Sequence, residues 1–445
     1  MTIHKPDFTL PRGQRIAVIG SGISGASAAW ALSAIADVSL YEAGSRAGGH
    51  TATVDIDYDG TPISVDTGFI VYNELNYPNL TALFRHLDVE TVESDMGFAL
   101  SLDNGRLEWC GSSLAQVFAQ RRNVVSMPFL WMLREILRFN RQCRADKADG
   151  LLAGISIGNY LKLRDFSQRF IDDYLIPMAA AIWSTPRIRM MDFPAETFVT
   201  FFENHRLIDF ERPVWRTVKG GARTYLDKLL APLGERVRLR EPVTAVHREG
   251  DGVRVATARG AARYDAVIIA AHSDQALAML ADPSPAETSI LSTVGYRENR
   301  VILHRDESLM PRRRQAWAAW NYLRDSRDDG TAEVAVTYWM NKLQAIDASK
   351  PLFVSLNPPR EPRAGTVFGE YSYAHPQFDA AALAAQRALP SIQGARNTWF
   401  AGAWTGFGFH EDGLKSGLAA AEQLGAVIPW REPALPVHED LVAAE

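Results

Sequence analysis

The stretch that decides the fold reads Arg15-Ile-Ala-Val-Ile-Gly20-Ser-Gly22-Ile-Ser-Gly25, followed by an alanine-rich segment, Val38-Ser-Leu-Tyr-Glu42 and Arg46-Ala-Gly48-Gly49-His50. The apolar run 16–19 is typical of a strand buried on both faces of a parallel sheet. Three spaced glycines then lead into a helix, and an acid follows the first glycine after about 20 residues. This order predicts a strand–turn–helix–strand unit that binds a dinucleotide.

Each residue of the pattern has a physical role. Gly20 permits the tight turn, Gly22 lets the backbone approach a pyrophosphate, and Gly25 lets the helix pack closely on the strand. The first helical turn offers unpaired N–H groups and a positive dipole end to the phosphates. Glu42 stands where a carboxylate accepts hydrogen bonds from ribose hydroxyls, which argues against a cofactor with a 2′-phosphate.

A glycine pair just after the ribose acid is not needed by simple NAD dehydrogenases. The segment Glu42-Ala43-x-x-Arg46-x-Gly48-Gly49 therefore favours FAD, and here the sequence resembles the FAD-dependent amine oxidase and phytoene desaturase superfamily. Residues 16–50 match its fingerprint, except that His50 stands where Arg is commoner. The resemblance implies that FAD is bound by Gly20, Gly22, Ser24, Gly25, Glu42, Ala43, Arg46, Gly48, Gly49 and His50.

Composition limits the class of protein. A chain of 445 residues, 47% of them hydrophobic, is expected to form two or three lobes. A net charge of −5 argues against a nucleic-acid partner. The two cysteines offer neither a disulfide framework nor metal-ligand spacing, so no metal and a reducing, cytoplasmic location are expected. The N-terminus lacks the layout of a signal peptide, and no apolar run is long enough to cross a bilayer.

Three later segments match the same superfamily. Residues 218–226 resemble its Gly-Gly turn and helix back into the FAD domain. Residues 237–256 resemble its adenine-side strands, which implies contacts from Val243 and Val246, and the apolar strand 264–271 ends that unit. Residues 398–421 resemble its C-terminal flavin signature, which implies contacts from Gly402, Asp412, Gly413 and Leu414. Some amine oxidases attach flavin through a cysteine there, but this chain has Trp404, so non-covalent FAD is expected.

These matches predict an α/β fold: a Rossmann-like, glutathione-reductase-type FAD-binding domain with an inserted α+β substrate domain. The FAD domain is expected at 13–94, 212–278 and 394–428, and the substrate domain at 95–211 and 279–393. The segment around Pro283 and Pro285 is expected to be a loop between lobes. A tail rich in proline and acids, 429–445, is expected to be mobile.

Aromatic residues suggest where a substrate binds. Ordinary core packing explains any single one of them, whereas as a set they fit a long apolar pocket. The residues expected to contact the substrate are Trp183, Tyr338, Trp339, Trp404 and Phe409.

Because flavin accepts the hydride itself, the protein has only to position a C–H bond and handle a proton. His410, inside the flavin signature, is the first candidate for a proton acceptor, and His304 and His375 are weaker ones. Lys342 could hold a water molecule as a lysine does in many amine oxidases, although a solvated lysine explains it as well.

Residues 127–144 predict a helix that is both amphipathic and basic. Its apolar side holds Phe129, Met132, Leu133, Ile136 and Leu137, and its basic side holds Arg134, Arg138 and Arg141. Such a helix, with Trp131 at its border, can lie on an anionic membrane surface at the inner face of the membrane. A helix of the substrate lobe with solvated arginines is the other interpretation.

Several phrases resemble one bacterial branch of the superfamily, often encoded beside cyclopropane-fatty-acid-synthase-like methyltransferases: Gly49-His50-Thr, Val65-Asp66-Thr-Gly68-Phe, Val336-Thr-Tyr-Trp-Met-Asn341 and Gly408-Phe-His410-Glu-Asp-Gly413-Leu. That resemblance implies desaturation of a methyl-branched fatty acyl chain of phospholipid, towards a furan fatty acid, with a methyltransferase as partner. A flavin amine oxidase and a non-catalytic flavoprotein that binds lipid or assists another enzyme remain the alternatives.

Overall fold

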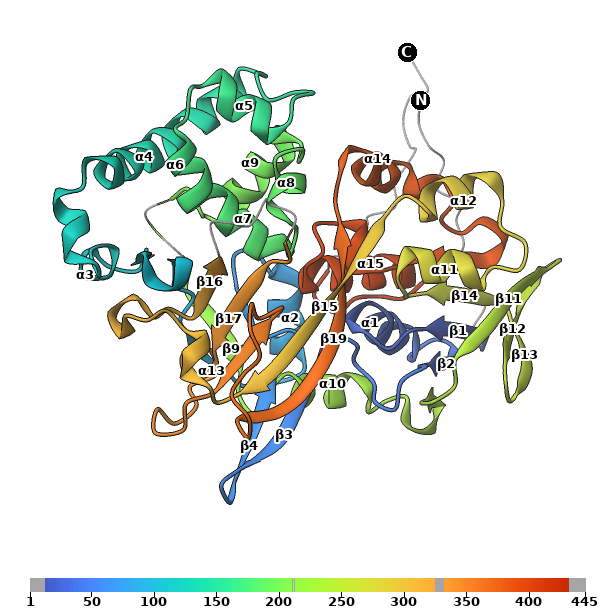
Figure 1. Ribbon diagram of the computed structural model, residues 1–445. Helices are drawn as coiled ribbons and strands as arrows, with labels where there is room; N and C mark the ends of the chain where they lie inside the picture. The colour runs from blue at the N-terminus through green and yellow to red at the C-terminus, as the bar shows by residue number, and fades with distance from the viewer. Residues whose placement is uncertain (1–12, 210, 212, 325–331, 432–445) are drawn as a thin grey trace, which may run out of the picture.

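The computed structural model describes residues 13–209, 211, 213–324 and 332–431. A parallel sheet lies on one side and a helical lobe on the other, with a long mixed sheet between them (Figure 1). The parallel sheet has the order β10-β2-β1-β14-β20: β10 (Val237–Arg238), β2 (Asp37–Tyr41), β1 (Arg15–Ile19), β14 (Ala266–Ile269) and β20 (Thr398–Phe400). Mixed α/β architecture around a parallel sheet is thereby confirmed.

Strand β1 lies at the centre of this sheet and is buried on both faces, as its apolar run predicts. Ile16 and Val18 pack with the apolar residues of the helices on one face. Ala17 and Ile19 pack in the opposite direction, with Val253 and other residues of a small antiparallel sheet. That second sheet consists of β11 (Val243–Glu249), β12 (Gly252–Thr257) and β13 (Gly260–Tyr264).

Two helices cover the helical face and approach each other closely. Helix α1 (Ile23–Leu32) follows β1, and α15 (His410–Gln423) comes from the far end of the chain. A Cβ on Gly25 would lie 1.8 Å from the carbonyl oxygen of Gly20, and one on Gly417 would lie 2.0 Å from that of Ser24. Only glycine permits these contacts, so the two residues fix how α1 sits against the sheet and α15 against α1.

The other elements near the parallel sheet are short. Helices α2 (Pro78–His86) and α10 (Arg223–Leu230) pack beside α15 and α1 respectively. Two further antiparallel sheets pair β3 (Thr53–Tyr58) with β4 (Thr61–Asp66), and β9 (Trp215–Val218) with β5 (Val71–Asn73) and β6 (Thr91–Ser94).

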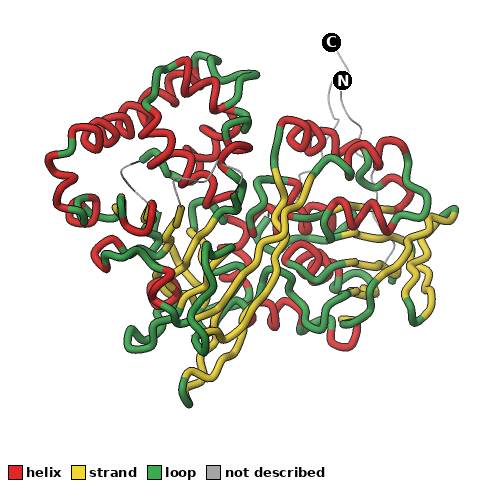
Figure 2. Tube along the Cα trace, in the orientation of Figure 1, coloured by secondary structure: helices red, strands yellow, loops and turns green. Residues whose placement is uncertain are grey.

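The long mixed sheet has the order β19-β15-β18-β17-β16-β7-β8, in which only β16 and β7 run parallel among the described strands. Its strands are β19 (Val367–Gln377), β15 (Gly295–His304), β18 (Phe353–Leu356), β17 (Ala335–Trp339), β16 (Trp320–Arg324), β7 (Phe98–Leu102) and β8 (Leu107–Cys110). Strands β15 and β19 cross the middle of the molecule, between the two lobes (Figure 2).

The helical lobe is built from one continuous stretch of chain. It holds α3 (Leu114–Val117), α4 (Met127–Ala148), α5 (Ile157–Leu163), α6 (Gln168–Phe170), α7 (Ile176–Trp183), α8 (Arg187–Met190) and α9 (Ala195–Asn204). A π-helical turn, η3 (Ile171–Leu175), joins α6 to α7 without a break. Four more helices lie elsewhere: α11 (Ser273–Met279), α12 (Pro285–Leu291), α13 (Met340–Leu343) and α14 (Ala380–Ala388).

Two expectations need correction. Pro285 is not in a loop, because it is the first residue of α12, where its fixed φ and missing N–H suit a helix start. Ser284 and Glu287 form a capping box around it, a signal that the proline pattern obscured. The predicted apolar side of residues 127–144 is also divided: Phe129 and Met132 are buried in the lobe, whereas Leu137 is exposed.

The predicted mobile tail lies, from residue 432 onwards, outside the described residues. No helix among those that the structure describes is long and apolar enough to cross a membrane.

The close contact of α15 with α1 can be tested by Gly417→Ala. The new Cβ meets a backbone oxygen that cannot move aside, so the free energy of unfolding should fall by about 1–3 kcal/mol. Gly295→Ala is the matched control, because a Cβ there meets no atom within 4 Å. Thermal unfolding of both variants measures the effect, and equal melting temperatures would contradict the packing argument.

Candidate active site and cofactor cavity

A single cavity of about 560 Å³ reaches from the turn between β1 and α1 to the long mixed sheet. Residues 20–24, Glu42 and residues 48–50 line one part of it. The segments 402–404 and 407–410, before and at the start of α15, line another. Apolar side chains of the mixed sheet and the helical lobe line the remainder. A cavity of this size, with few polar groups, is typical of a small-molecule site.

The glycine turn has the shape that a dinucleotide requires. A Cβ on Gly20 would lie 2.5 Å from the carbonyl oxygen of Ala270, so this residue closes the turn, and its φ of +98° also favours glycine. At Gly22, in contrast, a Cβ would meet no atom within 4 Å although the residue lines the cavity. The absence of a side chain at Gly22 thus keeps space open for a ligand at the N-terminus of α1, where free N–H groups suit phosphate.

Glu42 lies at the end of β2, beside the glycine turn. Its carboxylate accepts hydrogen bonds from the N–H and hydroxyl of Ser21 and, at 2.7 Å, from the N–H of Gly44. A carboxylate has about four acceptor positions, so it retains capacity for a ribose hydroxyl. The residues present fit FAD at this end of the cavity.

Arg46 acts on the loop rather than on the cavity. Its guanidinium donates to the carbonyl oxygens of Gly49 at 2.8 Å and Thr51 at 3.1 Å. It therefore stabilises the loop that carries Gly48, Gly49 and His50 to the cavity wall, although Arg46 does not itself line it.

Asp412 shapes the turn before α15. Its buried carboxylate accepts hydrogen bonds from the N–H groups of Phe407 and Phe409, each at 3.0 Å. Burial raises the pKa of Asp412 to about 6, against the effect of these two bonds. The turn directs the positive end of α15 towards the cavity, which favours negative charge there.

His410 is the first residue of α15 and faces the cavity. Its ring stacks on Phe69, with the centroids 3.9 Å apart, and its Nε2 shares a hydrogen bond with the hydroxyl of Tyr225. That hydroxyl in turn lies 2.6 Å from the hydroxyl oxygen of Thr51. His410 is thereby held in one orientation and linked to a short chain of hydroxyl groups.

The histidines that line the cavity are His50, His205, His272, His375 and His410. Burial lowers the pKa of His50 and His410 to about 3, and that of His205 and His375 to about 4; the pKa of His272 is lowered too. All five are therefore neutral near pH 7. His50 and His375 lie 5.5 Å apart between centroids and give the wall two imidazole rings without positive charge.

The substrate end of the cavity takes its shape from the helix with the π turn. Tyr174, Met178 and Ile182 are spaced by four residues and line the cavity, followed by Trp183. A π turn adds one residue to a helical turn and often marks a functional site. The strands opposite contribute further apolar walls from Phe98, Trp109, Val301, Trp320, Tyr338, Val354 and Leu356.

Charged side chains are scarce around this cavity. Among the described residues that line it, Glu42 is the one carboxylate and Arg206 the one guanidinium or ammonium. Glu42 lies at the dinucleotide end, and Arg206, exposed, pairs with Asp209 at 3.1 Å. The apolar end therefore has no carboxylate in the described part of the chain. No group of three or more described His, Cys, Asp or Glu residues is arranged to hold a metal ion.

The structure brings many of the predicted residues to this cavity. Those that line it are Gly20, Gly22, Ser24, Glu42, Gly48, Gly49, His50, Gly402 and His410 from the cofactor and catalytic predictions, and Trp183, Tyr338, Trp404 and Phe409 from the substrate prediction. The predicted cofactor and substrate residues that do not line the cavity are Gly25, Ala43, Arg46, Val243, Val246, Asp412, Gly413, Leu414 and Trp339. Gly25 and Gly413 instead let helices pack: a Cβ on Gly413 would lie 2.8 Å from Ile23.

Two of the catalytic candidates lie away from the cavity lining. His304 is fully buried, with its Nε2 2.8 Å from the hydroxyl oxygen of Ser355, and serves the core of the mixed sheet. Lys342 donates to Asp95 at 2.9 Å in an ion pair that is partly exposed. Neither residue lines the cavity. Spacing alone could not indicate this, because His304 ends β15 and Lys342 lies in α13, and the side on which each residue faces depends on packing against distant segments.

Sequence reasoning missed several residues that form the wall. Phe69, Tyr373 and His272 line the cavity, and Phe69 is the ring on which His410 stacks. Phe69 ends a phrase already singled out for resemblance, Val65-Asp66-Thr-Gly68-Phe69. His272 directly follows the buried strand that carries Ala270 and Ala271 to the glycine turn, so the strand end itself was a usable signal.

The family model for flavin-containing amine oxidoreductases matches residues 23–344, more than two thirds of the chain. The chain belongs to this family. Members of this flavin-containing oxidoreductase family bind FAD, in agreement with the shape of the cavity. No curated protein sequence matches.

Solved structures share the fold of this family member at low identity. Putrescine oxidase bound to putrescine has 16% identity and a TM-score of 0.63, covering 94% of this chain and 99% of that one. Cyclohexylamine oxidase from Brevibacterium oxydans has 16% identity and a TM-score of 0.64, covering 93% and 99%. A CLA-producing fatty acid isomerase from P. acnes has 14% identity and a TM-score of 0.64, covering 95% and 98%.

Gly22→Ala should reduce FAD content without unfolding the protein. The backbone at Gly22 has a φ of −59°, which alanine adopts freely, and the new methyl group projects only into open space. The purified variant should melt like the FAD-stripped native protein but hold at least about tenfold less flavin per chain at equal FAD concentration. Gly295→Ala controls for handling, and unchanged flavin content would contradict the role of Gly22.

The neutral histidines predict a loss of stability in acid. A histidine takes up its proton at the ordinary pKa of 6.5 in the unfolded chain but only near 3 at His410, so the unfolded state binds more protons between these values. The contribution of such a group to the free energy of unfolding keeps its full value above pH 6.5, the ordinary pKa of histidine. It falls as the pH drops, by about 1.4 kcal/mol per such histidine between about pH 7.5 and about pH 5.5.

His410→Phe isolates one such group, since phenylalanine preserves the stacking on Phe69. Urea unfolding at both pH values gives the change in the free energy of unfolding for each protein. The titratable groups common to both proteins cancel when the two changes are compared. The variant should lose about 1.4 kcal/mol less than the native protein over this interval. Identical pH dependence would mean that His410 takes up its proton at the same pH in the folded and unfolded states, which would contradict a pKa lowered by burial.

Proposed function

We propose that this protein is an FAD-dependent oxidoreductase that introduces a double bond into an apolar acyl chain. The substrate class proposed is a methyl-branched or otherwise modified fatty acyl chain of phospholipid. The observation that carries the proposal is the composition of the substrate end of the cavity, which is apolar and aromatic and has no carboxylate among its described residues.

Charge is the first argument for a neutral substrate chain. An ammonium group buried in such a wall would lack an ionic partner, and an unpaired buried charge is strongly unfavourable. The five lining histidines offer no negative charge, and Glu42 is engaged by Ser21 and Gly44. A hydrocarbon chain gains free energy at the same surface, about 25 cal/mol for each Å² of apolar area buried.

The fold is a second, weaker argument. One solved structure with the same fold is described as a fatty acid isomerase, so this architecture can accommodate an acyl chain. The phrases around Gly49-His50 and Gly408-Phe-His410 resemble the branch encoded beside cyclopropane-fatty-acid-synthase-like methyltransferases, and such a methyltransferase is the proposed supplier of the substrate. We also propose that the FAD domain is of the glutathione-reductase type. We further propose that FAD is held without a covalent bond, since Trp404 stands where some amine oxidases have a cysteine and Cys110 and Cys143 are buried away from the cavity lining.

The chemistry divides between the cofactor and the protein. Bound FAD would supply the two-electron acceptor for a substrate C–H bond. The protein's residues would hold the chain against Tyr174, Met178 and Ile182, exclude water, and receive the proton from the neighbouring carbon so that a C=C bond is formed. His410 is the proposed acceptor, because its neutral imidazole faces the cavity and is linked through Tyr225 to Thr51.

A flavin amine oxidase is the second candidate. Structures with the same fold include putrescine oxidase and cyclohexylamine oxidase, which favours this reading at the level of architecture. An aromatic pair facing the substrate would support it further. Trp404, however, is buried and donates its indole N–H to the carbonyl oxygen of Ala271 at 3.2 Å, while Phe409 packs on Phe201.

Anaerobic flavin reduction tests the proposal. Methyl-branched phospholipids in detergent should bleach the oxidised flavin band, and mass spectrometry should find a product two hydrogens lighter. A panel of amines should not bleach it. Bleaching by amines alone would favour the amine oxidase, whereas tight lipid binding without bleaching by any substrate would favour the non-catalytic flavoprotein.

A pair of variants links the activity to the cavity. Met178→Trp fills the apolar end and should slow lipid-dependent bleaching at least about tenfold, with flavin content unchanged. Leu163→Trp is the control, since Leu163 is exposed on the same lobe outside the cavity. Equal rates in both variants would separate the reaction from this cavity.

A further inference from the structure

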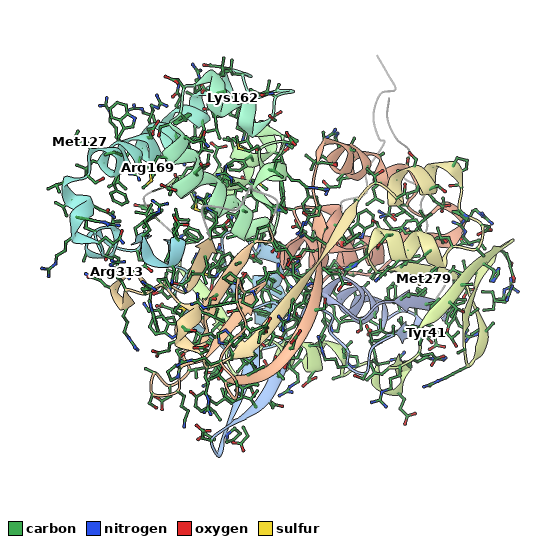
Figure 3. The ribbon with its side chains drawn as sticks, viewed as in Figure 1. Tyr41, Met127, Lys162, Arg169, Met279 and Arg313 are labelled. Atoms are coloured by element: carbon green, nitrogen blue, oxygen red, sulfur yellow. The ribbon has the colours of Figure 1, made fainter. Side chains whose placement is uncertain are left out.

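The outer end of the helical lobe carries a cluster of exposed apolar side chains. Six of the 13 large hydrophobic residues exposed in the described chain fall between positions 114 and 137: Leu114, Val124, Val125, Met127, Trp131 and Leu137. Leu114 is 79% exposed, Val125 80% and Met127 71%. Met127 lies at the outer edge of the lobe, on the side away from the parallel sheet (Figure 3). Clustered exposure of this kind marks an interaction surface.

Helix α4 has two different apolar faces. Phe129, Met132 and Phe139 point inward and are fully buried in the lobe. Met127 and Trp131, spaced by four residues, share the outward face, and the guanidinium of Arg134 lies 5.0 Å from the ring centroid of Trp131. The outward face therefore combines apolar side chains with an aromatic ring and a cation, which is the composition of a helix at a lipid–water interface.

The segment of sequence that forms this face carries only positive charge. Between Glu108 and Glu135 the sequence contains no Asp or Glu but includes Arg121, Arg122 and Arg134, although the whole chain carries a net charge of −5. The exposed arginines 312–314 belong to the loop that lies beside α3, where Gln315 donates to the carbonyl oxygen of Ala115 at 3.4 Å. Arg313 pairs with Glu108 at 2.8 Å and Arg314 with Glu307 at 3.6 Å, so the loop adds less positive charge than its three arginines alone would. An anionic surface is the partner that matches both the arginines and the apolar side chains between them.

The same surface adjoins the substrate end of the cavity. Strand β8 is the edge strand of the mixed sheet and ends at Cys110. Phe98, Trp109 and Gly111 line the cavity, and three residues after Gly111 the chain reaches exposed Leu114 at the start of α3. The exposed face and the apolar end of the cavity are therefore joined by a short stretch of chain.

We propose that α3, the turn 121–125 and the first two turns of α4 dock on an anionic phospholipid bilayer. The apolar side chains of Leu114, Val125, Met127 and Trp131 enter the acyl boundary, and the arginines contact lipid headgroups. This inference rests on the proposed function only where it gives docking a purpose, namely to bring a phospholipid acyl chain to the cavity. The docking itself is argued from the surface alone.

Sedimentation with vesicles tests the docking independently of turnover. The full-length FAD-loaded protein is mixed with vesicles of phosphatidylcholine alone or of equal parts phosphatidylcholine and phosphatidylglycerol. Binding to the anionic vesicles, decreasing at high salt, is expected. The double variant Val125→Asp with Met127→Asp should bind at least about tenfold more weakly. Val367→Asp, at an exposed valine on β19, should bind like the native protein.

Other outcomes would overturn the docking proposal. These are an absence of binding to either vesicle, equal binding by the native protein and the double variant, or a salt-independent dimer that dissociates in the double variant and so assigns the face to a second copy of the chain. Activity separates the two proposals: the double variant should retain native turnover of detergent-dispersed phospholipid and lose it on vesicles. Absence of turnover with native vesicle binding would contradict the proposed function alone.

Discussion

The rest of the structure depends on one constraint: the turn after β1, helix α1 and helix α15 approach one another so closely that only glycine fits at the contacts. Gly25 lets α1 lie against the turn that follows β1, and Gly417 lets α15 lie against α1. Because both helices then direct their N-termini to the same cavity, the two ends of the chain contribute to one binding site. The loop held by Arg46 completes this arrangement from the side of β2.

Burial determines the electrical character of the cavity as much as residue type does. Five histidines would suggest a basic or metal-binding site in the sequence, yet burial lowers each pKa far enough to keep the rings uncharged. Asp412 is nearly enclosed as well, but it serves the turn at Phe407 and Phe409 rather than a ligand. The cavity thus combines hydrogen-bonding groups with an almost uncharged wall.

The glycine turn and Glu42 were predictable from sequence because their determinants are local, whereas Val243 and Val246, expected to contact the adenine, do not line the cavity. Gly20, Gly22 and Glu42 act through backbone space and a fixed spacing, which a linear pattern records. His304 and Lys342 illustrate the limit: both lie near strands whose facing depends on pairing with distant segments, and no spacing reveals that pairing. The π turn that presents Tyr174 and Met178 was equally invisible, since one additional residue in a helical turn leaves no compositional mark.

The order in which the parallel sheet is assembled has a consequence for biosynthesis. Strand β1 is made first, but its neighbour β14 follows some 250 residues later and β20 later still. A sheet closed by such distant partners has high contact order and forms slowly. The nascent chain therefore carries an incomplete parallel sheet with an unpaired edge at β1 until β14 has been made. Because the start of α15 lines the same cavity, the cavity is complete only after α15 has been made, and the strand edges need protection until then.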